Sequence, residues 1–308
     1  MSQPAVNGLQ SVRNYTKYLA LVAFLAGSIA LWWQSLASTV RLALSSDAHT
    51  YILLILPVSV ALIYLETNRN TATSGSGKWV GAILLGAALL LRGLTGSTVN
   101  FSPSDGLALS MFALVIWLIG SIVVCFGLQL FRSLLFPVCF LFLVVPLPDS
   151  VLNWITEFLQ QQSAWAASIL FRAVGVPVTV GGVMLSIPGL NIEVARECSS
   201  IRSSTMLFVV TLILAHLFLR TWPGKTLLVL SAIPLSVAKN ALRIFTISEL
   251  GTRVDPGFLT GNFHRRGGIV FLSLALLATV LLLWALRKGE IQAALRIPAN
   301  SRPSNSFL

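Results

Sequence analysis

The stretch that decides the fold is residues 106–131, GLALSMFALVIWLIGSIVVCFGLQLF, which carries no charged side chain between Asp105 and Arg132. A helix of about 20 predominantly apolar residues is long enough to cross the hydrocarbon core of a bilayer. Similar apolar runs recur along the 308-residue chain, in which 56% of the residues are hydrophobic and 10% are charged. Because soluble proteins contain roughly 25% charged residues, this composition predicts an integral membrane protein.

Charged residues mark the ends of eight predicted transmembrane helices, so the expected fold class is an all-α polytopic membrane protein. The helices are expected at 18–37, 49–65, 79–95, 106–131, 133–148, 199–219, 226–250 and 267–286. The first of these has an alternative interpretation as a signal peptide, because Ser35, Leu36 and Ala37 resemble a cleavage site of small residues. Its length of about 20 residues exceeds a typical signal-peptide core and favours a membrane span.

The distribution of charge predicts the orientation, because cytoplasmic loops of membrane proteins are enriched in Lys and Arg. With the N-terminus in the cytoplasm, the tails and the even-numbered loops hold nine of the eleven net positive charges, with Glu66 and Glu290 as their acidic residues. The basic residues on that side are Arg13, Lys17, Arg69, Lys78, Arg132, Arg220, Lys225, Arg287, Lys288, Arg296 and Arg302. The excess of basic residues therefore marks the cytoplasmic loops and tails beside the lipid bilayer, and no nucleic-acid partner is expected.

The segment 149–197 is less apolar and is expected outside the hydrocarbon, on the extracytoplasmic side. A helical period over 152–174, interrupted at Gln160, Gln161 and Gln162, predicts an amphipathic helix at the membrane interface. A buried ninth span is the alternative. The apolar residues of this period are Ile155, Phe158, Leu159, Trp165, Ala166, Ile169 and Leu170.

Between 176 and 194, short β-branched runs separated by Gly181 and Gly182 predict a β-hairpin. The chain therefore divides into five regions. They are a cytoplasmic tail 1–17, a five-span membrane region 18–148, the extracytoplasmic helix and hairpin 149–197, a three-span core 198–286 and a cytoplasmic tail 287–308.

Polar residues concentrate in the last third of the chain. Lys239, Asn240 and Arg243 lie inside the predicted helix 226–250, where a charge costs about 2.5–3.5 kcal/mol on insertion scales. A snorkelling cation that anchors the helix is one explanation of Arg243. The parity of the crossings between 198 and 267 gives another, because it brings Cys198, Arg243 and His264 to the same face of the membrane.

A cysteine, a histidine and an arginine together are the residue types that acyl transfer through a thioester requires. A thiol with the ordinary pKa of about 8.5 is only a few per cent thiolate at neutral pH, and a helix N-terminus with nearby cations lowers this pKa. Cys198 precedes a predicted helix with Ser199 or Ser200 as the candidate N-cap and Arg202 one turn further on. His264 is the candidate general base and acid, and Arg243 is the candidate stabiliser of the oxyanion.

Other residues are expected to support this set or to have no part in it. Glu197 and Glu193 are candidates to orient His264 or to pair with Arg196, and Asn240 lies on the same helix as Arg243. Cys125 and Cys139 are expected to be apolar fillers, and His49 and His216 have no assigned role. Three cysteines, two of them in apolar runs, do not suit a structural metal site or a disulfide framework. No cofactor or metal is expected.

Three motifs in these residues resemble the exosortase/archaeosortase family of multi-pass membrane cysteine transpeptidases. Residues 197–204, ECSSIRSS, are similar to the family's Cys-Ser-Gly-(Ile/Leu)-Arg motif. Residues 239–244, KNALRI, are similar to its Asn-x-x-Arg-Ile motif, and residues 263–271, FHRRGGIVF, to its final His-x-x-Gly block. The resemblance implies Cys198, Arg243 and His264 as catalytic residues. Ser200 departs from the pattern, because the family usually has glycine there.

The resemblance also implies a substrate class and a location. Family members recognise exported proteins that carry a C-terminal sorting signal, made of a Pro-Glu-Pro-type motif, one transmembrane helix and a basic tail. The enzyme would lie in the cytoplasmic (inner) membrane with its active site facing the periplasm or exterior, and exopolysaccharide or protein export machinery is an expected partner. The alternatives are a transporter, in which Lys239 and Arg243 bind an anion, and a non-catalytic scaffold of an export system. Transporters usually place such charges near the bilayer midplane within paired repeats, and no repeat is visible here.

Overall fold

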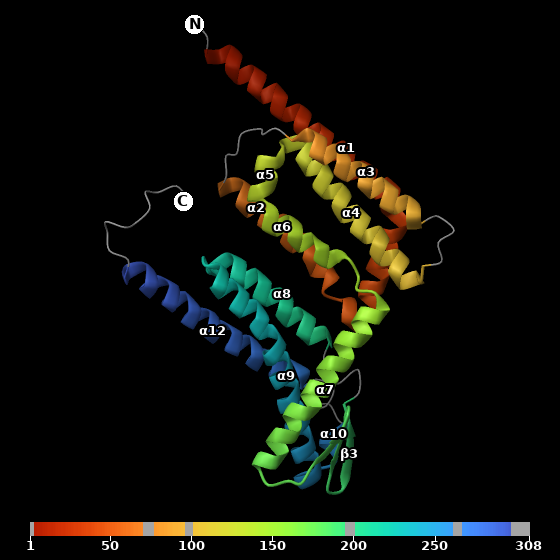
Figure 1. Cartoon of the computed structure of the whole chain (residues 1–308), viewed down its shortest axis with the longest axis vertical. Coiled ribbons are helices and arrows are strands. Elements are labelled where there is room, and N and C mark those ends of the chain that lie inside the picture. Colours follow the sequence, from red (N-terminus) through yellow and green to blue (C-terminus); the bar gives the residue numbers. More distant parts are fainter. Residues whose placement is uncertain (1–2, 70–76, 96–100, 195–200, 261–266, 297–308) are drawn as a thin grey trace. The chain divides into compact units, whose positions relative to one another are not determined.

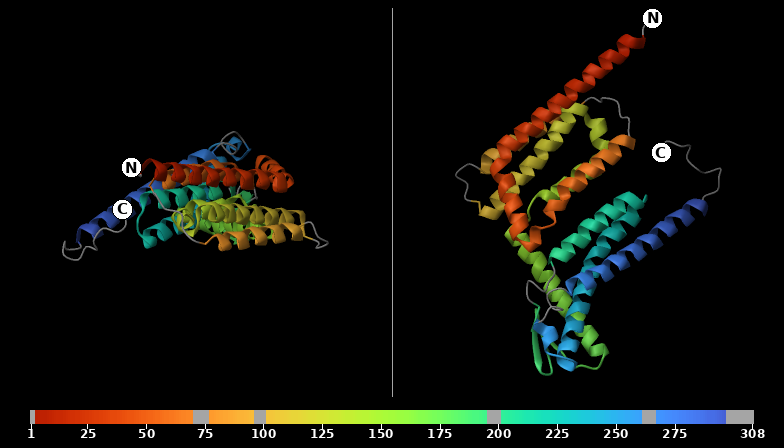
Figure 2. Two further views of the ribbon diagram at one scale, coloured as in Figure 1. Left: turned by 90° about the horizontal axis from the view of Figure 1, so that it is seen from above. Right: turned by 180° about the vertical axis from the view of Figure 1, so that it is seen from behind.

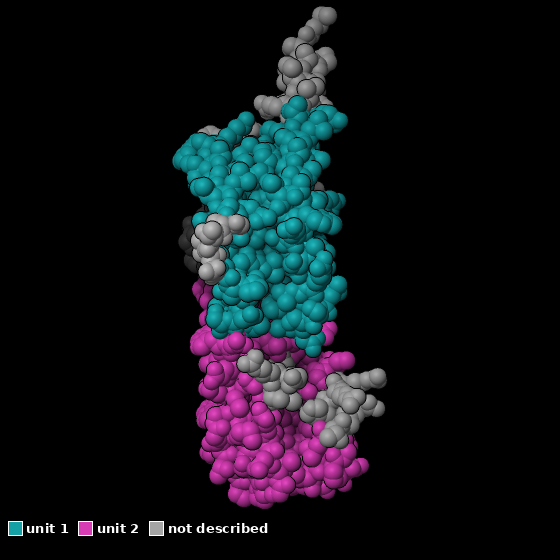
Figure 3. All heavy atoms as spheres, turned by 90° about the vertical axis from the view of Figure 1, so that its right-hand side faces the viewer, with its two compact units in different colours: residues 1–152 teal, residues 153–308 magenta. Residues whose placement is uncertain are grey.

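A computed structural model describes residues 3–69, 77–95, 101–194, 201–260 and 267–296. The chain divides into two compact units, Met1–Leu152 and Asn153–Leu308, which Figure 3 colours separately. Helices dominate both units, and the strands that the structure describes form one small three-stranded sheet. The predicted fold class, an all-α polytopic membrane protein, is confirmed.

The described residues of the first unit form helices and no strands. Its elements are α1 (Gln3–Ser45), the 3-10 helix η1 (Asp47–His49), α2 (Ile52–Arg69), α3 (Lys78–Thr95), α4 (Pro103–Phe126), α5 (Leu128–Ser133), α6 (Leu135–Phe140) and the 3-10 helix η2 (Leu141–Val144). Helices α1 and α3 lie along α4, and α2 lies beside α6 (Figure 2). Most of the charge-free stretch thus lies in the central helix of this unit, and half of the residues of that helix are buried.

Polar contacts between α1 and α4 are made by side chains inside the apolar sequence. The Trp32 indole N–H donates to the Ser110 carbonyl oxygen at 2.9 Å, and the Ser35 and Ser110 hydroxyl oxygens lie 2.7 Å apart. The Trp117 indole N–H donates to the Phe24 carbonyl oxygen at 3.2 Å. Because an unpaired polar group is costly away from water, these bonds fix the register of the two helices.

The predicted fourth and fifth spans differ from the observed helices. The fourth ends at Phe126, because Gly127 adopts a φ of +87°, which ends the helix before α5 begins. The fifth was predicted over 133–148, but helical structure there ends at Val144. Two prolines in 145–148 cannot donate the hydrogen bonds that would continue the helix.

The structure therefore contains seven described helices that are long and apolar enough to cross a membrane. The number rises to eight if Leu135–Val144 and its bent continuation Asp149–Ala173 are one broken span. Alone, ten residues of helix reach about 15 Å, half of the roughly 30 Å hydrocarbon core. The predicted count of eight is thus the upper of these two values.

The second unit combines a helical bundle with a small α/β layer. Its elements are most of α7 (Asp149–Ala173), the strands β1 (Thr179–Gly181), β2 (Met184–Ile187) and β3 (Leu190–Glu193), and the helices α8 (Ile201–Phe218), α9 (Trp222–Arg253), α10 (Gly257–Thr260) and α12 (Gly268–Arg296). Helices α8, α9 and α12 lie side by side, and α7 packs on the sheet beside the far end of α9 (Figure 1).

The contacts within this bundle define its two ends. Glu290 of α12 accepts hydrogen bonds from the backbone N–H groups of Arg220 and Thr221, at 3.0 and 2.9 Å, in the turn between α8 and α9. The opposite end of the bundle therefore holds the start of α8, the end of α9 and the start of α12. This arrangement agrees with the convergence that the crossing parity predicts for the chain between 198 and 267.

Helix α7 has two faces of different composition. The side chains packed against the protein are mostly small or polar, including Thr156, Gln160 and Ser163. The large residues Trp154 and Trp165 are 69% and 60% exposed, on the outer face. A helix with an aromatic outer face is suited to lie at a membrane interface, where tryptophan is enriched.

The segment after α7 forms an antiparallel meander with the order β1-β2-β3, where a single hairpin was predicted. Gly182 occupies the first turn with a φ of +63°, and Pro188-Gly189 forms the second, in which Gly189 has a φ of +80°. Glycine tolerates this conformation without steric cost. Leu185 and Ile187 of β2 are buried with Phe171 of α7 and Ile244 of α9 in one hydrophobic core.

The close approach of α3 and α4 generates a stability prediction. A Cβ atom on Gly81 would lie 2.6 Å from Val124 Cγ2 and 2.9 Å from the Gly120 carbonyl oxygen, so Gly81→Ala forces the helices apart. We expect a loss of about 1–3 kcal/mol of stability, typical of overpacking, measured by thermal unfolding of the detergent-solubilised protein. Gly86→Ala on the same helix meets no atom within 4 Å and should leave the melting temperature unchanged or higher. Equal melting temperatures of the two variants would contradict this packing.

Candidate functional site

The first turn of α8 is held against α9 by a buried lysine. The Lys239 ammonium group, on α9, donates a hydrogen bond to the hydroxyl oxygen of Ser203, in the first turn of α8. A buried ammonium is costly unless it is hydrogen-bonded, so this contact ties the two helices together at this level. Ser203 follows Cys198 by five residues in the chain.

Arg243 lies one helical turn beyond Lys239 and lines a cavity of about 230 Å3. Residues four apart on a helix are neighbours on its surface, so the two cations concentrate positive charge on this part of α9. The opposite wall consists of all four residues of β3 and of Val194. Ile244, Ile247 and Ser248 of α9 and Leu259 of α10 complete the lining. An anionic or strongly polarised group bound here would be stabilised by this charge.

A buried glutamine holds the end of β3 in place. The Gln160 side-chain amide, on α7, donates to the Val194 carbonyl oxygen at 2.5 Å. Val194 itself is fully buried, and its N–H donates to the Val183 carbonyl oxygen at 2.9 Å. The N–H and C=O groups of Val194, the last residue before 195–200, are therefore held by the sheet and by α7.

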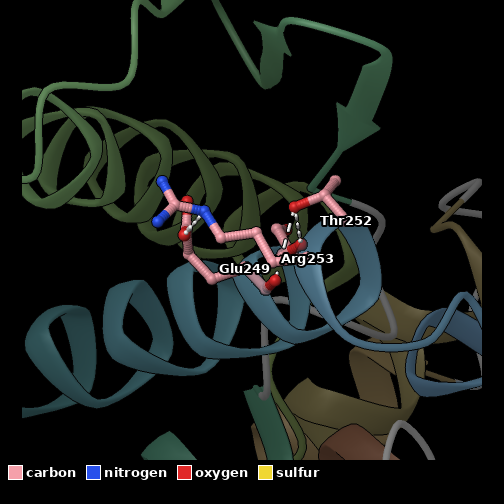
Figure 4. Close-up of polar contacts among 4 residues, drawn as sticks. Glu249, Thr252 and Arg253 are labelled. Atoms are coloured by element: carbon pink, nitrogen blue, oxygen red, sulfur yellow. Dashed lines mark hydrogen bonds and ion pairs between the residues drawn. The ribbon is translucent and has the colours of Figure 1, made fainter.

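The C-terminal end of α9 carries local polar contacts (Figure 4). The Arg253 guanidinium pairs with the Glu249 carboxylate at 2.7 Å, and the Thr252 hydroxyl donates to the Ser248 carbonyl oxygen at 2.8 Å. Charged and hydroxyl side chains in the last turn keep the helix intact beyond the bundle.

Helix α10 packs tightly on this end of α9. Leu259 lies so close to Gly251 that a Cβ atom there would be 2.5 Å from the leucine side chain. The Asp255 carboxylate accepts the Gly257 N–H at 2.7 Å and shapes the turn into α10. These contacts hold Leu259 in the wall of the cavity, five residues before His264 in the chain.

The predicted site residues fall into two groups. Arg243 lines the cavity, Asn240 is buried on the same helix, and Arg202 is an exposed residue in the first turn of α8. The others, Cys198, His264, Glu197 and Ser199, lie outside the described residues, as does Ser200. Among the described residues, no group of three or more His, Cys, Asp or Glu side chains is arranged to hold a metal ion.

Sequence reasoning missed Gln160, Ser203 and the contribution of β3. Gln160 stands within a run of three glutamines that looks like a break in the apolar period, and the pattern does not show which of the three is buried. Ser203 is one of two adjacent serines, and only the packing of α8 on α9 shows which of them meets Lys239.

Comparison with known proteins identifies the family. A model of the transmembrane exosortase family matches residues 32–282. The chain belongs to this family. Neither a curated protein nor a solved structure matches it. Membership supports a role as a membrane transpeptidase or protease in general, and the multi-pass membrane character of the exosortase agrees with the helices described above.

The bond from Gln160 to Val194 generates a prediction about the approach to Cys198. Gln160→Leu leaves the buried Val194 carbonyl without this donor, which costs about 1–3 kcal/mol. Hydrogen exchange should rise in β3 and Val194, while the bundle keeps its protection. Gln161→Leu is the matched control, because the Gln161 side chain is exposed and donates to Glu157 on its own helix, at 3.1 Å. If both variants exchange like the wild type, Gln160 does not hold this strand.

Proposed function

We propose that this exosortase is a cysteine peptidase or transpeptidase whose reaction takes place at the end of the α8–α9–α12 bundle that meets α7 and the sheet. The observation that carries the proposal is the cavity that Arg243 shares with β3 and α10. The chain continues from β3 to Cys198 and from α10 to His264. Strand β3 and the α9–α10 region, which are distant in sequence, thus meet beside Arg243.

Chain lengths support this assignment. Cys198 is four residues after Val194, which lines the cavity, and three residues before Ile201, which begins α8. His264 is five residues after Leu259 and four before Gly268, which begins α12. Consecutive Cα atoms are about 3.8 Å apart, so each of these short segments limits how far its residue can lie from the same end of the bundle.

The proposed reaction uses the three residues in separate roles. The Cys198 sulfur attacks the carbonyl carbon of a substrate peptide bond, and His264 accepts the thiol proton. Arg243 stabilises the tetrahedral oxyanion. The carbon–nitrogen bond then breaks, and His264 protonates the leaving amine. Attack on the thioester by water gives a free acid, attack by an amine gives a new amide, and either returns the thiol.

The supporting residues have proposed positions around these three. Ser199 caps the start of α8, and Arg202 in its first turn lowers the energy of a thiolate. Glu197 orients His264. Asn240, buried beside Lys239, polarises the same part of α9. Ser200, in place of the family's usual glycine, adds a side chain next to the nucleophile.

The proposed orientation places this end of the bundle outside the cytoplasmic membrane. The opposite end carries Arg220, Lys225, Arg287 and Lys288, and a basic end of this kind is expected in the cytoplasm. The tails 1–17 and 287–308 then lie in the cytoplasm. Segment 149–197 lies at the outer face, with the exposed tryptophans of α7 at the interface.

The proposed substrates are exported proteins with a C-terminal sorting signal of the Pro-Glu-Pro type, followed by a transmembrane helix and a basic tail. The substrate helix would lie in lipid beside the bundle. The substrate segment that precedes this helix would then reach the C-terminal end of α9. Exopolysaccharide or protein export machinery is the proposed partner of the remaining spans.

The test is to follow by immunoblot, in the native host, a reporter that carries such a C-terminal signal. We expect the reporter to shorten with wild-type protein and with Cys125→Ser, because Cys125 is buried on α4 in the first unit. It should stay full length with Cys198→Ser, because a hydroxyl is a far weaker nucleophile than a thiolate. A full-length reporter in all strains, or a shortened one with Cys198→Ser, would contradict the proposal.

A further inference from the structure

Strand β3 has an open edge. In the order β1-β2-β3 it pairs only with β2. The Val194 N–H donates to the Val183 carbonyl oxygen, and hydrogen-bonded and non-hydrogen-bonded positions alternate along an antiparallel pair. With the register Met184↔Glu193 and Ser186↔Asn191, the backbone groups of Asn191 and Glu193 therefore point away from β2.

This open edge borders the cavity that contains Arg243. All of β3 lines it on one side, and Ile244, Ile247 and Leu259 give it an apolar opposite wall. The volume of about 230 Å3 is below the roughly 300–1,000 Å3 of small-molecule sites. A space of this size beside a strand suits one or two side chains of an extended peptide.

We propose that β3 is the docking strand for the substrate, which adds an extended segment to the sheet as a fourth strand beside α9. This inference rests on the proposed function and names how the peptide is held. The N–H and C=O groups of Asn191 and Glu193 pair with the backbone of the added strand. Alternate side chains of that strand face Ile244, Ile247 and Leu259, which selects apolar residues at every second position.

The position of Arg243 decides in favour of this edge. A strand paired with Glu193 lies beside the wall that carries the guanidinium, and β3 leads after four more residues to Cys198. A carbonyl carried by the added strand is thereby brought toward both groups. Binding through the backbone also leaves the side chains to set specificity, so the same edge accepts different exported proteins.

The other edge of the sheet provides the comparison. Strand β1 is exposed along its whole length, and the register Val180↔Leu185 turns the Val180 backbone outward in the same way. The hollow beside it is lined by Trp165, Gln161 and Gln162 and contains no cation. We therefore expect the substrate at β3 and not at β1.

The test removes one outward N–H group from each edge in the full-length protein and follows reporter shortening in cells. Asn191→Pro deletes a donor on β3 and blocks pairing there, while its bonds to β2 are kept because that N–H points outward. Val180→Pro makes the same change on β1, and Asn191→Ala alters the side chain but keeps the backbone donor. We expect shortening to slow about tenfold or more with Asn191→Pro, to slow much less with Asn191→Ala, and to stay at the wild-type rate with Val180→Pro.

A photoreactive residue, p-benzoylphenylalanine, at position 191 or 180 in the Cys198→Ser protein measures docking without catalysis. The reporter should crosslink from position 191 and not from position 180. This readout also decides the matter if either proline variant proves unstable.

Three results would overturn the docking strand: wild-type shortening with Asn191→Pro, slowing confined to Val180→Pro, or no crosslink from position 191. If the reporter crosslinks from position 191 but is never shortened by wild-type protein, docking stands and the proposed peptidase function fails. If it is shortened without that crosslink, the function stands and the docking strand fails.

Discussion

The length of α9 is the constraint on which the rest of the second unit depends. Its 32 residues extend about 48 Å, well beyond the roughly 30 Å of a hydrocarbon core. The first part packs with α8 and α12 around Leu228 and Leu283, and the part from Ala241 onward packs with α7 and the sheet. One rigid element therefore joins a membrane bundle to an α/β layer.

The cations of α9 lie where these two environments meet. Lys239 reaches the first turn of α8, and Arg243, one turn later, lines the cavity bordered by β3. At this level the energetic cost of the Lys239 charge falls, because the Ser203 hydroxyl replaces lipid as its partner. The same position suits the charge to the proposed acyl transfer, in which the Arg243 guanidinium would stabilise an oxyanion that forms in the cavity.

Much of this was predictable from sequence, and particular residues show where prediction stopped. Apolar runs identified the membrane helices because lipid imposes a simple length requirement, and three motifs led to the family. The predicted fifth span ended too far along the chain, because the two prolines in 145–148 stop the helix at Val144. The sequence predicted an amphipathic α7, but only the structure shows that its protein-facing side consists mostly of small or polar residues such as Ser163 and Ala167. Gln160 and β3 emerge only from tertiary packing.

The central claim is that peptide cleavage proceeds through a thioester on Cys198, beside Arg243. Hydroxylamine captures a thioester as a hydroxamate, so the most direct measurement is the mass of the new C-terminus on reporter released from membranes in its presence. The account predicts a C-terminal hydroxamate with wild-type protein and none with Cys198→Ser. Release of the free carboxylate alone at saturating hydroxylamine, at the wild-type rate, would contradict it.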